Sequence, residues 1–176
     1  MSRAVDEARL ERDIAYRFRW LAEFIGLTDR DLRIIRAARP LLTPLIPDLT
    51  ERIRARMFAW ESTRRHFLRD GQVDPAIVGA HLGGYIERLL ELAGDDRMGP
   101  YLDRVGAVHR RTAGDPTIDV PLVQVDALLG FIADQMIAVI ADMSLPETRK
   151  IDAIRAFSKL LWIQNDLMRR RYLPVE

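Results

Sequence analysis

Apolar residues recur along this chain at intervals of three and four, and no run alternates convincingly between apolar and polar positions as a strand would. This spacing predicts an all-α fold. We expect one domain over residues 1–176, because no repeat, low-complexity segment or linker divides the chain. The predicted helices cover residues 4–24, a stretch that begins near 28–31, and residues 48–60, 63–69, 74–93, 100–114, 119–143 and 147–172.

Short side chains that carry an oxygen atom mark several of the predicted helix starts. Thr28 stands where an N-cap is expected, and Asp74 precedes Pro75, which suits the first helical position. Ser144 and Glu147 have the spacing of a capping box, in which each side chain bonds the backbone amide of the other residue. These signals predict short connections between the helices.

The last two predicted helices carry more apolar surface than a one-sided contact needs. The helix over 119–143 also contains Asp126, Asp134 and Asp142, which indicates a buried core helix rather than a membrane span. Two interpretations of the surplus surface stay open: it pairs with a second copy of the chain, or the N-terminal helix covers it. The residues that represent this surface are Leu128, Ile132, Leu160 and Ile163.

Composition and charge exclude several classes of protein. Hydrophobic residues make up 48% of the chain and charged residues 30%, which is typical of a globular domain. The formal net charge is +1, so no basic field favours nucleic acid as a partner. The absence of cysteine excludes disulfides and thiolate metal sites. The N-terminus has charges throughout and no apolar secretory segment, and we therefore expect a cytoplasmic protein.

His109 is the histidine whose surroundings are most apolar. Its helical neighbours point it into the core, whereas a charged face on the opposite side includes Asp103, Arg104 and Arg110. A buried neutral imidazole either finds hydrogen-bond partners or binds a metal, and the pattern leaves both roles open. The apolar neighbours of His109 are Tyr101, Leu102, Val105 and Val108.

The other candidate residues have simpler interpretations. His81 lies at the edge of an apolar helix face, and His66 is predicted to be a surface residue beside a buried Phe67. The arginines at 169–171 are interpreted as part of a solvated face. The chain has no phosphate-binding glycine loop and no HExxH or GxSxG motif.

Four stretches of the chain resemble one known family. They are AYRFRWLAEFIGLTDRDL, ESTRRHFL, YLDRVGAVHRRTAG with the following PTIDVPLVQVDALLGFI, and FSKLLWIQNDLMRRRYL. The chain resembles the protoglobins, relatives of the globin domains of bacterial globin-coupled sensors. The resemblance implies a globin-like helical sandwich with an extra N-terminal helix, a haem b held by one proximal histidine, and a homodimer formed through the last two helices.

The resemblance also assigns roles to individual residues. The histidine of VGAVHRRTAG is the proximal iron ligand of the family, which is His109 here. A haem needs one imidazole on an apolar wall, so the pattern around His109 agrees with this role. The residues expected to line the haem pocket are Ile53, Arg54, Phe58, Val78, Leu82, Tyr85, Val105 and Val108.

One position departs from the family pattern. Family members usually carry an aromatic pair on the second helix, with a tyrosine that donates a hydrogen bond to the bound ligand, but the two positions are Ile53 and Arg54 here. Three interpretations stay open. Arg54 points to solvent and leaves an apolar distal side, it reaches into the pocket, or the register of this helix differs by one residue.

The resemblance predicts a haem protein that reversibly binds a diatomic gas, which is dioxygen, carbon monoxide or nitric oxide. Gas or redox sensing is the favoured role, and the output would then come from a separate signalling partner. A haem enzyme that acts on peroxide or nitric oxide is one alternative, because an open iron position also supports turnover. A haem-free regulatory dimer with a globin fold is the other.

Overall fold

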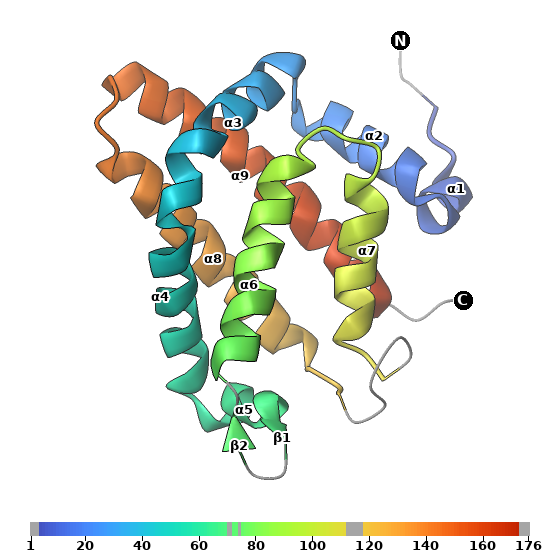
Figure 1. The fold of residues 1–176 in the computed structure, drawn as a ribbon. Helices are drawn as coiled ribbons and strands as arrows, with labels where there is room; N and C mark the ends of the chain where they lie inside the picture. The colour runs from blue at the N-terminus through green and yellow to red at the C-terminus, as the bar shows by residue number, and fades with distance from the viewer. Residues whose placement is uncertain (1–3, 70–71, 74, 112–117, 173–176) are drawn as a thin grey trace.

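The computed structural model is built almost wholly of helices (Figure 1). It describes residues 4–69, 72–73, 75–111 and 118–172, with the backbone alone for residues 69, 73 and 75–80. The predicted all-α fold is confirmed. The α-helices are α1 (Glu7–Arg12), α2 (Ile14–Ile25), α3 (Asp29–Leu42), α4 (Ile46–Phe58), α5 (Glu61–Arg64), α6 (Pro75–Glu91), α7 (Met98–Val108), α8 (Leu122–Asp142) and α9 (Glu147–Arg169).

Shorter elements connect these helices. The 3₁₀-helices are η1 (Thr43–Leu45), η2 (Arg65–Phe67) and η3 (Arg170–Tyr172). Strands β1 (Leu68–Arg69) and β2 (Gln72–Val73) form a minimal antiparallel hairpin where the predicted helix 63–69 was expected to end. The sequence between these strands is Asp-Gly, which is a strong hairpin signal that the helical spacing of 63–69 concealed.

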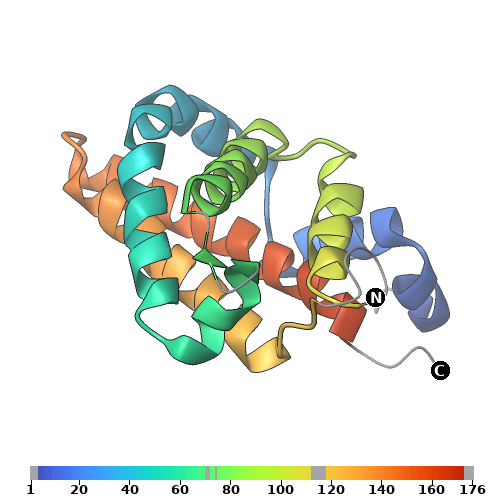
Figure 2. The same ribbon diagram turned by 60° about the horizontal axis from the view of Figure 1, so that its bottom comes forward.

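The helices form two layers. In Figure 1, α4, α6 and α7 run side by side, and α8 and α9 cross behind them; Figure 2 shows the same separation from the bottom of that view. Helix α9 contacts α2, α3, α7 and α8, so it is the centre of the domain. Its side chains Phe157, Leu160, Ile163 and Leu167 are fully buried, and each contributes about 1.5–3 kcal/mol through removal of apolar surface from water.

The exposed apolar surface of α8 and α9 is formed by other residues than those predicted from the sequence. Ile132, Leu160 and Ile163 belong to the core of a single chain, because their helix faces meet α4, α7 and each other. The apolar side chains that α8 and α9 leave exposed are Val123, Ile151 and Trp162, whose exposed fractions are 72%, 54% and 66%.

Helix α8 is long and apolar enough to cross a membrane by length and composition alone. Its inner face, which includes Ile132, Met136 and Ile140, is nevertheless buried in the core of the domain. This agrees with the prediction of a core helix, because a core helix of a globular domain can be as long and as apolar as a membrane span.

The predicted N-terminal helix is two helices with a break at Asp13. The backbone of Asp13 is extended, and its carboxylate accepts a hydrogen bond of 2.9 Å from the amide of Tyr16 at the start of α2. An aspartate that caps a new helix in this way ends the preceding one. Helix α2 then packs on α9, where Arg17 bonds Asp166 through Nε at 2.6 Å and Nη2 at 2.9 Å.

The other predicted helix ends had mixed outcomes. Thr28 caps α3 in a complete capping box with Asp31. The capping box of Ser144 and Glu147 is wrong, because α9 starts at Glu147 with Pro146 as its N-cap, and no side chain bonds the amides at its start. Asp74 lies outside the described residues.

Candidate functional site

His109 ends helix α7 and is partly buried. Its Nδ1 atom lies 2.7 Å from the carbonyl oxygen of Val105, one turn earlier in the same helix. Burial lowers the pKa of His109, the bond to Val105 partly opposes that shift, and the charge of His66 adds to it. The imidazole is therefore neutral near pH 7. Its Nδ1–H donates to Val105, and its Nε2 keeps a lone pair.

Helix α7 was expected to run from 100 to 114, but it spans Met98–Val108. The backbone amide of Val120 donates to the carbonyl of His109 at 2.9 Å, which fastens the end of α7 to the start of α8. Residues 109–111 form a turn and a bend instead of helix, and residues 112–114 of the predicted helix lie outside the described residues.

Helices α6, α7 and α9 meet on the side of α7 that carries Gly106. A side chain at Gly106 would collide with the backbone of Met168, so α7 and α9 touch directly at this point. The hydroxyl of Tyr85 on α6 lies 3.8 Å from the Sδ atom of the same Met168. Burial and the neighbouring Tyr101 raise the pKa of Tyr85 well above its ordinary value, so its hydroxyl keeps its proton.

The residues predicted to line a pocket come from three neighbouring helices. On α6, Leu82 and Tyr85 are partly buried against the core, as is Val105 on α7. On α4, Ile53 is fully buried, and Phe58 is partly buried with its ring centroid 5.9 Å from that of Phe67. These residues fit an apolar wall.

Two of the predicted lining residues stand apart. Val108 departs from the predicted buried face because it is 43% exposed at the last turn of α7. The helix ends there, so Val108 has no following turn to cover it. The side chain of Val78 lies outside the described ones.

Arg54 lies along its own helix. Its Nε donates to Glu51 at 2.7 Å, and its guanidinium carbon lies 5.3 Å from the ring centroid of Phe58. Glu51 is mostly exposed, and its hydrogen bond raises the pKa of Arg54 further above its ordinary value. This geometry matches an arginine directed along the surface.

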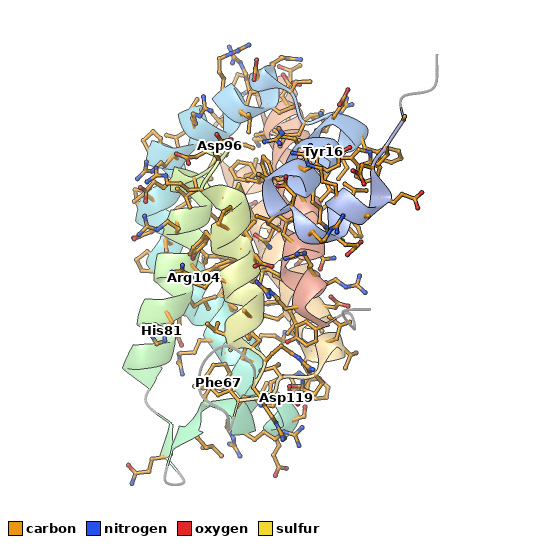
Figure 3. All side chains as sticks on the ribbon, turned by 90° about the vertical axis from the view of Figure 1, so that its right-hand side faces the viewer. Tyr16, Phe67, His81, Asp96, Arg104 and Asp119 are labelled. Carbon is orange, nitrogen blue, oxygen red and sulfur yellow. The ribbon has the colours of Figure 1, made fainter. Side chains whose placement is uncertain are left out.

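His66 is a residue of this region whose surroundings the sequence analysis missed. Instead of lying free on the surface, it is partly buried, and its Nε2 lies 3.0 Å from Oε1 of Gln124 in the first turn of α8. The two residues are 58 positions apart, so no local pattern reveals the contact. Figure 3 shows the neighbouring Phe67 together with Asp119 at the end of the molecule where α7 ends, and His81 on the outer side of α6, where it is exposed.

The donor set around His109 fits a haem. A globin haem iron takes one imidazole from the protein, while its porphyrin supplies the in-plane ligands. His109 offers one neutral imidazole, orientated by a carbonyl acceptor through its other nitrogen, which is the arrangement a histidine ligand needs. Among the described residues, no three His, Asp or Glu side chains gather into an all-protein metal cluster.

Comparison with known proteins decides the family. The model of the family described as Protoglobin matches residues 14–176. The chain belongs to the protoglobin family. Its fold is also similar to the globin domain of the Geobacter sulfurreducens globin-coupled sensor, with a TM-score of 0.77 and 18% identity, covering 89% of this chain and 97% of that one. No curated protein matches the chain.

Membership of the protoglobins confirms the resemblance seen in the four sequence stretches. The structural likeness, at 18% identity, shows the globin-like fold and nothing finer. A globin-family fold implies haem binding in general.

Proposed function

We propose that this protoglobin binds one haem b through Nε2 of His109 and reversibly binds a diatomic gas, most simply as a sensor. The observation that carries the proposal is the neutral, partly buried imidazole whose Nδ1 is bonded to the Val105 carbonyl. A bound haem would supply an iron atom with an open position for dioxygen, carbon monoxide or nitric oxide.

The protein residues have distinct tasks in this proposal. The Val105 carbonyl holds the His109 ring in one orientation and keeps Nε2 free of its proton. Leu82, Tyr85 and Ile53 contribute to an apolar wall that keeps water from the gas-binding side. Val78 and Phe58 are proposed to extend that wall, and Val105 is proposed to line the pocket on the His109 side.

Helix α4 lacks the tyrosine that family members use as a donor. Arg54 stands at that position and bonds Glu51, so α4 offers no neutral donor there. A hydrogen bond of that kind stabilises a bound polar ligand by about 1 kcal/mol or more. The proposal therefore favours carbon monoxide and nitric oxide, whose binding depends less on a donor, over long retention of dioxygen.

A homodimer is part of the proposal. Val123 on α8 and Trp162 on α9 are largely exposed, and large exposed apolar side chains on neighbouring helices favour a protein interface. A pocket of about 600 Å³ opens between α2 and α9 beside Trp162. A side chain of a second copy could fill this pocket. In the sensor role, the dimer would act on a separate signalling partner in the cytoplasm.

The visible spectrum of the purified protein, titrated with haem, tests the proposed function. We expect saturation at one haem per chain, with a ferrous spectrum that changes on addition of carbon monoxide. A chain that takes up no haem would leave the haem-free regulatory dimer as the function. Steady turnover of peroxide or nitric oxide by the loaded protein would instead indicate an enzyme.

A further inference from the structure

Residues 170–172, which follow α9, pack against the C-terminal part of helix α7. Arg170 donates from Nη1 to Oδ1 of Asp103 at 2.9 Å, and Arg171 donates from Nε to the same oxygen at 2.9 Å. The Asp103 side chain is only 12% exposed. The sequence pattern places Asp103 on a charged helix face and the arginines on a solvated face, whereas the structure pairs them with each other.

A second contact joins the same segment to the residue after His109. The guanidinium of Arg110 lies 5.0 Å from the ring centroid of Tyr172 and bonds Asp119 at 2.9 Å. Tyr172 is partly buried, and burial is the main cause that raises its pKa to about 12. The end of α7 is thereby held from two directions.

A third contact lies between these two. Gly106 packs against the backbone of Met168, where even a methyl group would not fit. We call residues 168–172 the C-terminal clasp. The clasp touches α7 at Asp103 and Gly106, and it touches Arg110 just after the helix ends. In the sequence, Val105 and His109 lie between the first and last of these positions.

We propose that Asp103 is a positioning residue for His109: the clasp holds the last turns of α7 through the Asp103 carboxylate and so sets the angle at which the imidazole meets the haem. This inference rests on the proposed function. Two features support it. Asp103 faces two arginines in a nearly buried place, and the bond from His109 to Val105 lies within the clasped turns, so their backbone orientates the ring directly.

The clasp also reaches the N-terminal helices. Arg170 donates from Nε to the carbonyl of Glu11 at 3.2 Å while its Nη1 holds Asp103. Glu11 in turn accepts from Arg17 of α2 at 3.1 Å. Arg170 thus bonds α1 as well as Asp103.

The test compares Asp103→Asn with Asp166→Asn. Asp166 is the α9 partner of the largely buried Arg17 and does not take part in the clasp, so its substitution also removes a carboxylate from a nearly buried arginine. We expect Asp103→Asn to release haem about tenfold faster, the usual scale when an outer partner of a metal ligand is lost, and to shift the iron–histidine stretching band. Asp166→Asn should change neither, and Asp103→Glu should restore most of both.

Equal haem release and identical iron–histidine bands in the two asparagine variants would overturn the proposal. If Asp103→Asn does not fold, Arg171→Gln replaces it, because Arg171 is 47% exposed and its loss leaves Arg170 on Asp103. A band and a release rate unchanged in Arg171→Gln would then overturn it.

A readout without haem separates this proposal from the proposed function. In the haem-free protein, NMR follows the Nδ1 proton of His109, which is bonded to Val105. Asp103→Asn should speed the exchange of this proton with solvent, and Asp166→Asn should leave it unchanged. Identical exchange rates in both variants would count against Asp103 as a positioning residue even if the chain binds no haem.

Discussion

Val105 and His109 are joined by a hydrogen bond of 2.7 Å between a backbone carbonyl and the Nδ1 atom of the imidazole, four residues apart on one helix. The bond selects the tautomer in which Nε2 carries no proton and keeps its lone pair. Burial, and not this bond, favours the neutral ring in the folded chain, because the bond by itself raises the pKa of His109.

The haem-free protein should lose stability as the pH falls below about 6.5. Burial lowers the folded-state pKa of His109 below its ordinary 6.5, so in this range the unfolded chain binds more protons than the folded chain. The unfolding free energy then falls with acidification, by about 1.4 kcal/mol for each unit of pKa depression. Urea unfolding between pH 7.5 and pH 5.5 measures this, with His109→Leu expected to give a flatter dependence. Equal slopes for both proteins would contradict it.

Much of the fold follows from helical periodicity alone. The long apolar patterns of α8 and α9 are strong enough that their predicted bounds, 119–143 and 147–172, agree with the structure to within a few residues. The break at Asp13 was missed, because the apolar spacing continues across it. The break is decided by the capping bond of Asp13 and by the bond from Arg17 to Asp166, which lies 149 residues away in the sequence.

A methyl group at Gly106 should destabilise the domain by about 2–3 kcal/mol or prevent folding, because it collides with the backbone of Met168 and neither helix can shift cheaply. Gly130 is the matched control. It lies exposed within α8, and a side chain there meets nothing within 4 Å, so Gly130→Ala should be neutral or stabilise by about 0.5–1 kcal/mol. Thermal unfolding of the two variants separates these outcomes, and a Gly106→Ala protein as stable as the unsubstituted chain would disprove the α7–α9 contact.

The proposed dimer predicts different results for exposed and buried positions. Trp162→Glu should give a folded monomer at tens of micromolar, roughly where a standard interface holds. Trp60→Glu, at a tryptophan that is 60% exposed and far from α8 and α9 in sequence, should leave the dimer intact. Ile163→Glu should unfold the chain, because it buries a charge in the core. Sedimentation velocity measures all three, and an unsubstituted monomer would refute the dimer.

Arg54→Leu should leave the azide affinity of the ferric haem protein within about twofold of its original value. Arg54 bonds Glu51 on the surface of α4, so no fixed positive charge faces the ligand. Loss of this solvent-screened ion pair should leave the stability of the fold nearly unchanged. A tenfold loss of azide affinity would show that Arg54 points inward. Arg54→Tyr, which restores the family residue, should slow the release of dioxygen.

In the candidate site, as in the fold, local features could be predicted from the sequence, and contacts between distant residues could not. His109 was identified from its apolar face and its family motif, both of which are local. The bonds from His66 to Gln124 and from Asp103 to Arg170 were not, since they join residues 58 and 67 positions apart. Charged and polar residues on a helix are predicted to be solvated unless a partner is known, and only the tertiary structure supplies these partners.

Haem titration of His109→Ala beside His81→Ala tests the central claim most directly. His81 is exposed on α6, so the pair separates an iron ligand from a surface histidine. The account predicts that His81→Ala binds one haem per chain with the spectrum of the unsubstituted protein, and that His109→Ala binds none stoichiometrically or recovers binding only with added imidazole. Stoichiometric haem in His109→Ala without imidazole, or loss of haem in His81→Ala alone, would contradict it.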